Sequence, residues 1–237
     1  MKRMLLNCFA LVAGALLVLP TLTFAQDYIP VPTPRPTATE QLGDLLKAKP
    51  LSVLPQKERA CRSRLRKMGV RFKAVERIHG KGKCGIKYPL EIAGLPGGVM
   101  LSGRTVLNCR AGEALAEWTV KTAAPAAQKR FKSKLIRIDQ YASYDCRTRN
   151  SKPGAKISQH SLGNAIDLGR FHMANGTIVD VASRPLPGMP KRRFMKTLRD
   201  AACTYFTTVL GPGSDVHHKD HFHFDIASRR NGYRYCK

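Results

Sequence analysis

An export signal at the N-terminus, with six cysteines behind it, constrains this chain more than any other feature. The chain begins with Lys2 and Arg3, continues as an apolar run from residue 4 to about residue 20, and reaches a small-residue cleavage sequence that ends at Ala25. This layout predicts a secretory signal over residues 1–25. An N-terminal membrane anchor is the alternative, but the apolar run is short for a spanning helix of about 20 residues.

The cysteines predict a disulfide-bonded fold. Of the seven in the chain, Cys8 lies within the predicted signal and six follow it. An even number in an exported protein predicts up to three disulfides, and the absence of any C-x-x-C pair argues against a cysteine-rich zinc site. The spacing does not choose among the pairings, and we expect Cys61–Cys84 as one local loop. The six cysteines are Cys61, Cys84, Cys109, Cys146, Cys203 and Cys236.

The composition divides the rest of the chain into two parts. Residues 26–54 predict a proline-rich linker, because proline alternates from Pro30 to Pro36 and favours an extended polyproline II segment. Residues 55–237 predict one globular domain, since 43% of the chain is hydrophobic and can build a core. No second long apolar run follows, so we expect no transmembrane segment after signal cleavage.

Hydrophobic periodicity predicts both helices and strands in this domain. The Asn175-Gly176 pair predicts a hairpin turn, and Pro125 should end the second helix. These features predict an α+β fold with disulfides, in which a small antiparallel sheet packs against helices. Helices are expected over residues 56–68, 111–123 and 191–209, and strands over residues 70–75, 135–138, 164–171, 177–181 and 221–227.

Residues able to bind a metal gather in two short segments, 158–167 and 217–225. Because a strand alternates its side chains between two faces, His221, His223 and Asp225 should share one face. Three such groups are costly to bury unpaired, so they either face water or bind something.

Two imidazoles and a carboxylate, with a fourth position open for water, form a catalytic zinc arrangement. An isolated histidine is usually an ordinary surface or core residue, and we interpret His79 and His172 in that way. The clustered residues are expected to form a metal site instead. They are His160, Asp167, His221 and His223.

The same segments resemble a known group of enzymes. Residues 158–167 fit the pattern Ser-x-His-x-x-Gly-x-Ala-x-Asp, and residues 221–223 fit His-x-His. These are the motifs of the zinc peptidases that include D-Ala-D-Ala peptidases, murein endopeptidases and hedgehog-like domains. More closely, the chain resembles the bacterial extensin-like C-terminal domain family over roughly residues 55–237. Further segments that carry this resemblance are 82–86, 143–147 and 218–225.

The resemblance implies a role for each matching position. His160, Asp167 and His223 fall where those peptidases hold Zn²⁺. It also implies the activity, a zinc metallopeptidase that cuts peptide cross-links or stem peptides of peptidoglycan in the periplasm or cell envelope. Because hedgehog-like relatives keep such residues without obvious peptidase activity, a non-catalytic wall-binding or structural module with the same fold is the alternative.

The resemblance also implies catalytic residues around the metal. His221 matches an active-site histidine of the murein endopeptidase branch, and His218 matches that branch in its spacing. Arg147 falls where related peptidases place an arginine near the scissile carbonyl, where its donors would stabilise an oxyanion. The dipeptidase branch has a glutamate where this chain has the shorter Asp220. We therefore favour His221 as general base, with Asp220 second and His218 as a substrate or transition-state contact.

The strong positive charge suggests an anionic partner. The chain has 41 Lys and Arg against 16 Asp and Glu, a formal charge of +25. Such a domain is drawn to anionic surfaces, and peptidoglycan or other anionic envelope material is the expected partner. Nucleic acid is not expected, because no nucleic-acid-binding fold signature is present and no stripe of interleaved aromatic and basic residues suggests a single-strand groove.

Overall fold

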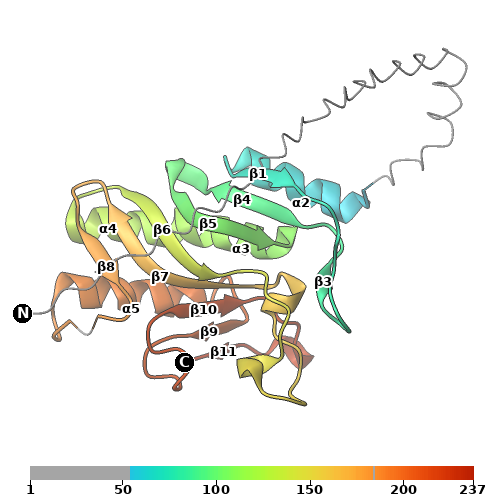
Figure 1. Ribbon diagram of the computed structural model, residues 1–237. Helices are drawn as coiled ribbons and strands as arrows, with labels where there is room; N and C mark the ends of the chain where they lie inside the picture. Colours follow the sequence, from blue (N-terminus) through green and yellow to red (C-terminus); the bar gives the residue numbers. More distant parts are fainter. Residues whose placement is uncertain (1–53, 184) are drawn as a thin grey trace, which may run out of the picture. The chain divides into compact units, whose positions relative to one another are not determined.

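A nine-stranded sheet forms the centre of the computed structural model, which describes residues 54–183 and 185–237 (Figure 1). The signal expected over residues 1–25 and all but the last residue of the linker expected over residues 26–54 lie outside the described residues. The strands are β1 (Arg71–Ala74), β4 (Leu90–Gly94), β5 (Met100–Leu107), β6 (Leu135–Ala142), β7 (Ala165–Met173), β8 (Ile178–Asp180), β9 (Thr208–Leu210), β10 (Phe222–Asp225) and β11 (Tyr235–Cys236). Their order is β1-β4-β5-β6-β7-β10-β9-β11, with β8 also paired to β7.

Helices cover one face of this sheet (Figure 1). A separate two-stranded ladder, β2 (Ile78–His79) with β3 (Gly85–Ile86), extends away from the main sheet at the right of Figure 1. A π-helical turn, Thr119–Ala123, makes α3 and α4 continuous. The helices are α2 (Gln56–Lys67), α3 (Cys109–Trp118), α4 (Ala124–Phe131) and α5 (Pro190–Ala202).

The α+β class is confirmed, but the sheet is larger than the small antiparallel sheet that the sequence predicted, and it is mixed. The β5–β6 and β9–β11 pairs are parallel, while the other pairs are antiparallel. Parallel neighbours need a crossover connection. Here the continuous helix from α3 to α4 supplies it between β5 and β6.

Two predicted helices have different limits in the structure. The helix expected to end before Pro125 continues to Phe131, because the π-helical turn Thr119–Ala123 lies directly before this proline and changes the hydrogen-bond pattern there. The helix expected over residues 191–209 ends at Ala202. Thr208 and Val209 form β9 instead, since these β-branched residues pair with β10.

Other predicted elements are confirmed close to their expected limits. The helix expected over residues 56–68 is α2, and the expected strand pair is β7 with β8. The turn between these two strands contains Asn175 and Gly176, and Gly176 has a φ of 83°. Because Asn175 does not share this positive φ, the connection is not a two-residue type I′ turn but a longer hairpin loop with glycine at its left-handed position.

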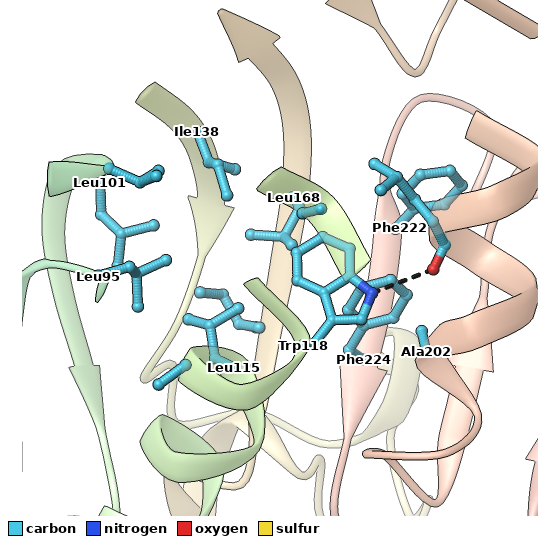
Figure 2. Packing of buried hydrophobic residues seen from close by; sticks show 14 of the residues in the cluster. Leu95, Leu101, Leu115, Trp118, Ile138, Leu168, Ala202, Phe222 and Phe224 are labelled. Atoms are coloured by element: carbon cyan, nitrogen blue, oxygen red, sulfur yellow. Dashed lines mark hydrogen bonds between the residues drawn. The ribbon is translucent and has the colours of Figure 1, made fainter. Parts of the chain in front are cut away.

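The core lies between the sheet and the helices, around Trp118 (Figure 2). The Trp118 side chain is fully buried, and its Nε1–H donates a hydrogen bond to the main-chain oxygen of Leu198 on α5 over 3.1 Å. Its ring packs edge-on against Phe224 of β10, with 5.3 Å between centroids. Trp118 therefore joins α3, α5 and β10 at one point.

The six cysteines form three disulfides, as the sequence predicted, but the expected Cys61–Cys84 pair is wrong. Cys61 pairs with Cys109 because α2 packs against the start of α3, and Cys84 pairs with Cys146. The third bond, Cys203–Cys236, joins the end of α5 to β11. Within residues 54–183 and 185–237, no helix combines the length and the apolar character needed to span a membrane.

We expect Trp118→Ala to destabilise the oxidised domain by about 3–5 kcal/mol, because it leaves a cavity in the centre of the core. Chemical denaturation followed by circular dichroism measures this change. Val120→Ala is the control, since Val120 lies nearby on the same continuous helix with 46% of its surface exposed. That variant should stay within about 0.5 kcal/mol of the parent. Equal losses in the two variants would contradict the central role of Trp118.

Candidate metal centre

Antiparallel pairing of β7 with β10 brings the two predicted segments together. His223 lies directly opposite Asp167, and Phe222 lies opposite Leu168. Because strands alternate, Phe222 and Phe224 enter the core while His223 projects from the other face. The shared face predicted for this strand is thus confirmed for His223 and Asp225, whereas His221 lies just before β10.

His160 reaches the same point from a short 3₁₀ turn, His160–Leu162, that precedes β7. Gly163 ends this turn with a φ of 64°, in the left-handed region that favours glycine. A Cβ at Gly163 would lie only 2.3 Å from Cδ1 of Ile86, so the turn is packed against β3. The glycine of the motif therefore sets the approach of His160.

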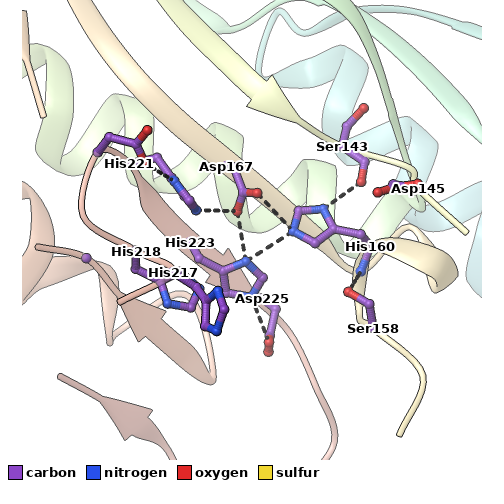
Figure 3. Close-up of polar contacts among 12 residues, drawn as sticks. Ser143, Asp145, Ser158, His160, Asp167, His217, His218, His221, His223 and Asp225 are labelled. Carbon is purple, nitrogen blue, oxygen red and sulfur yellow. Dashed lines mark hydrogen bonds and ion pairs between the residues drawn. The ribbon is translucent and has the colours of Figure 1, made fainter. Parts of the chain in front are cut away.

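The three side chains converge within hydrogen-bonding distance (Figure 3). Nδ1 of His223 lies 2.8 Å from Oδ1 of Asp167 and 3.1 Å from Nε2 of His160. Nε2 of His160 lies 3.2 Å from Oδ2 of Asp167. One possible ligand atom from each residue lies within 4.8 Å of the others, so these residues form a group that could hold a metal ion.

Each imidazole is oriented by a second hydrogen bond. Nδ1 of His160 donates to the main-chain oxygen of Ser143 over 2.6 Å, which directs Nε2 toward Asp167. Nε2 of His223 donates to the carboxylate of Asp225 over 3.2 Å, which directs Nδ1 to the same place. Outer partners of this kind fix the tautomer and the orientation of metal-binding histidines.

Asp225 is itself held by its neighbours. Its Oδ1 accepts hydrogen bonds from the hydroxyl of Thr208 over 2.6 Å and from the N–H of Ala227 over 2.9 Å. Nη2 of Arg229 donates to that hydroxyl over 2.5 Å. A continuous chain of contacts thus runs from Arg229 through Thr208 and Asp225 to His223.

The electrostatics of the group favour a cation at its centre. Burial disfavours the ionised carboxylate of Asp167. Hydrogen bonds from His160 and His223 outweigh this effect and hold the pKa of Asp167 well below its usual range. Burial likewise opposes protonation of His223, but Asp167 and Asp225 outweigh it and raise the pKa of His223 to about 9. Two buried carboxylates therefore require positive charge between them, which either a protonated His223 or a bound cation supplies. Because two imidazole nitrogens and a carboxylate oxygen are ligands that Zn²⁺ prefers, the donor set fits this ion.

Two further histidines lie beside this group, each with an aspartate on its Nδ1. Nδ1 of His221 lies 2.8 Å from Asp220, and its Nε2 lies 3.7 Å from Oδ1 of Asp167. Nδ1 of His218 lies 2.7 Å from Asp215. Burial lowers the pKa of His218, and this effect outweighs the opposite influence of Asp215. Both imidazoles are thus oriented by a carboxylate.

Arg147 lies in a loop that is fixed at two points. Its N–H donates to the hydroxyl of Ser161 over 2.9 Å, and that hydroxyl donates to the main-chain oxygen of Asp145 over 2.7 Å. The preceding residue, Cys146, is bonded to Cys84. Nε of Arg147 also pairs with the Asp145 carboxylate over 2.7 Å.

Comparison with known proteins identifies one family. Residues 59–237 match the family described as extensin-like protein C-terminus. The chain belongs to this family. No curated protein and no solved structure matches the chain. The matched range includes every residue of the candidate metal centre.

In this extensin-like domain the predicted residues line one cleft of about 410 Å³. Arg147, His218 and His221 share its walls with the three candidate ligands, whereas Asp220 contributes through His221. Asp220, the second candidate for the general base, therefore orients His221, the first candidate.

Several cleft residues had not been predicted as site residues. Arg149, Arg229 and Tyr235 line the walls, and Asp215 orients His218. Asp225 had been expected on the face of His223, and that alternation was the available signal for its role. The main-chain oxygen of Ser143 and the Thr208 hydroxyl carry no sequence signal, because only the fold brings them to the site.

We expect His160→Ala and His223→Ala to abolish Zn²⁺ binding, because each removes a ligand. Asp225→Asn should keep binding but weaken it by about 10–100-fold, since it disturbs only the orientation of His223. Competition with a chromophoric chelator measures the affinity, and circular dichroism confirms that each variant is folded. His79→Ala, at an exposed position outside the cleft, is the matched control. Unchanged affinity in His160→Ala would contradict the assignment.

Proposed function

We propose that this extensin-like domain is an exported zinc-dependent peptidase that hydrolyses peptide cross-links or stem peptides of peptidoglycan. The observation that carries the proposal is the convergence of His160, Asp167 and His223 in a cleft that also presents His221 and Arg147. The resemblance of the two motifs to those of zinc peptidases supports the same activity.

The three candidate ligands would hold Zn²⁺ by two imidazole nitrogens and one carboxylate. When bound, the ion supplies Lewis acidity and makes water a stronger nucleophile near neutral pH. The chain's own residues keep the ligands ready for it. Ser143 and Asp225 orient the two imidazoles, and the low pKa of Asp167 keeps that carboxylate ionised.

His221 is the proposed general base. Its Nδ1 is held by Asp220, so its Nε2 faces the cleft near Asp167 and can accept a proton there. The same nitrogen can then return the proton to the leaving amine. Asp220 is the positioning residue of this pair, because its carboxylate contacts the imidazole and its side chain is 61% exposed.

Arg147 and His218 are proposed to contact the substrate. Arg147 carries a permanent charge on a loop fixed by Ser161 and the Cys84–Cys146 disulfide, and its donors can stabilise a developing oxyanion. His218, oriented by Asp215, lines the same cleft as a substrate or transition-state contact. These side chains therefore surround the place where a peptide carbonyl would lie.

The proposed location is the periplasm or cell envelope, with peptidoglycan or other anionic envelope material as the partner. The three disulfides suit an oxidising compartment. The charge of +25 favours anionic material, and Arg147, Arg149 and Arg229 extend that charge to the cleft. A peptide with free carboxylates matches such a cleft.

Digestion of purified muropeptides by the oxidised protein tests the proposal. We expect mass spectrometry to show peptide-bond cleavage that a chelator abolishes and added Zn²⁺ restores. His221→Ala should lower kcat by about 100–10,000-fold while zinc content stays unchanged, because it removes a base and not a ligand. His79→Ala again serves as the control.

Two results would contradict the proposed peptidase activity. Cleavage that persists in folded His160→Ala or His223→Ala would show that it comes from elsewhere. A parent that binds zinc and muropeptides but cleaves none of them, with His221→Ala and Asp220→Ala indistinguishable from it, would instead identify a non-catalytic wall-binding module.

A further inference from the structure

A second groove, of about 780 Å³, lies along α5 and shares no lining residue with the metal cleft. The segment that precedes β10 contributes to both. His218 lines the metal cleft, and the next residue, Lys219, lines this second groove. Likewise His221 lines the first, and Phe222 lines the second. The two hollows therefore lie on either side of one segment.

The groove gathers positive charge from one stripe of α5. Arg192, Lys196 and Arg199 are spaced i, i+4 and i+7, so they follow one helix face, and Lys219 and Lys237 also line the groove. Among the described residues that line the groove, Asp200 is the acidic side chain, and it pairs with Lys196. The lining thus carries an excess of cations.

The helix itself does not account for these cations. Arg199 lies in the last turn of α5, where the helix dipole favours positive charge. Arg192 lies in the first turn, where the dipole disfavours it, and that turn has no acidic residue. An anion bound beside Arg192 would compensate both this cation and the positive end of the helix dipole.

Arg199 is fixed in place before any ligand arrives. Its Nε donates to the main-chain oxygen of Lys237 over 2.6 Å, and its Nη1 donates to that of Pro212 over 2.9 Å. Burial lowers the pKa of Arg199 against the opposite influence of Asp200, which reflects the cost of holding this guanidinium partly away from water. A rigid, partly buried guanidinium is suited to binding the oxygens of a phosphate.

Apolar side chains contribute to the rest of the lining. Met195, Pro185 and Pro212 are partly exposed, while Phe222 and Val181 are buried. A small inorganic anion would leave the partly exposed apolar side chains in contact with water. A ligand with both a charged head and an apolar part would cover the cations and the apolar walls together.

We propose that this groove binds a phosphate group carried on an apolar chain. The phosphate lies against Arg192, Lys196 and Arg199, and the apolar part covers Met195 and Pro212. This site does not depend on the proposed peptidase activity, because none of its residues belongs to the metal cleft. The phosphate ester comes either from a membrane lipid or from a soluble compound, and the two sources share this chemistry.

Calorimetric titration of the oxidised protein with octyl phosphate tests the proposal. Inorganic phosphate and neutral octyl glucoside serve as the comparison ligands. The variant Arg192→Gln/Lys196→Gln removes two groove cations. Lys191→Gln/Arg193→Gln is the matched control, because it removes two exposed cations of the same helical turn that do not line the groove.

We expect octyl phosphate to bind at least about tenfold more tightly than either comparison ligand, and the groove variant to lose at least about tenfold in affinity. The control variant should stay within about threefold of the parent, because it changes the overall charge equally. Equal losses in the two variants, octyl glucoside binding as tightly as octyl phosphate, or no binding of octyl phosphate would each overturn the site.

Vesicles distinguish the two sources of phosphate. Binding to phosphatidylcholine vesicles that contain phosphatidylglycerol, lost in the groove variant and kept in the control, supports a membrane lipid. Octyl phosphate binding without such vesicle binding supports a soluble phosphate ester.

Discussion

The register between β7 and β10 is the constraint on which the candidate metal centre depends. Asp167 and His223 are separated by 56 residues in the sequence, and the antiparallel ladder places them directly opposite each other. A slip of one residue would turn His223 into the core and Phe222 or Phe224 out of it. The core prevents this slip, because both phenylalanines are buried and Phe224 packs against Trp118 and Phe206. The position of a polar site is therefore set by apolar packing on the opposite face of the same strand.

The candidate metal centre also requires that His160 and His223 each direct one particular ring nitrogen toward Asp167. A carbonyl oxygen at Ser143 can only accept, so it requires a proton on Nδ1 of His160 and leaves Nε2 toward the site. Asp225 does the same for the other nitrogen of His223, and Thr208, Ala227 and Arg229 limit its movement. Since most of these supporting groups belong to strands or to residues next to them, the fold itself holds the three candidate ligands in place.

Much of the site could be predicted from the sequence, because strand alternation and short motif spacing are local properties. Alternation alone placed His223 and Asp225 on one face and the phenylalanines on the other, and the structure confirms this. The disulfide pairing could not be predicted in the same way, because the Cys61–Cys109 bond depends on how α2 packs against α3. The strand at Thr208 was predicted as helix for a similar reason, since its partner β10 lies more than ten residues further along the chain. Properties that depend on distant partners are not contained in a local pattern.

The loop from Gly211 to His221 contributes residues both to the cleft of the candidate metal centre and to the groove along α5. It begins tightly packed, because a Cβ at Gly211 would lie 2.6 Å from the ring of Phe222, and Ser214 closes a turn back to Gly211. Beyond that turn, Asp215 and His218 hold each other in the metal cleft while Lys219 faces the other groove. Because His218 and Lys219 share a peptide bond, a displacement of this backbone would move both residues. A change at one site that displaces the segment would therefore be felt at the other.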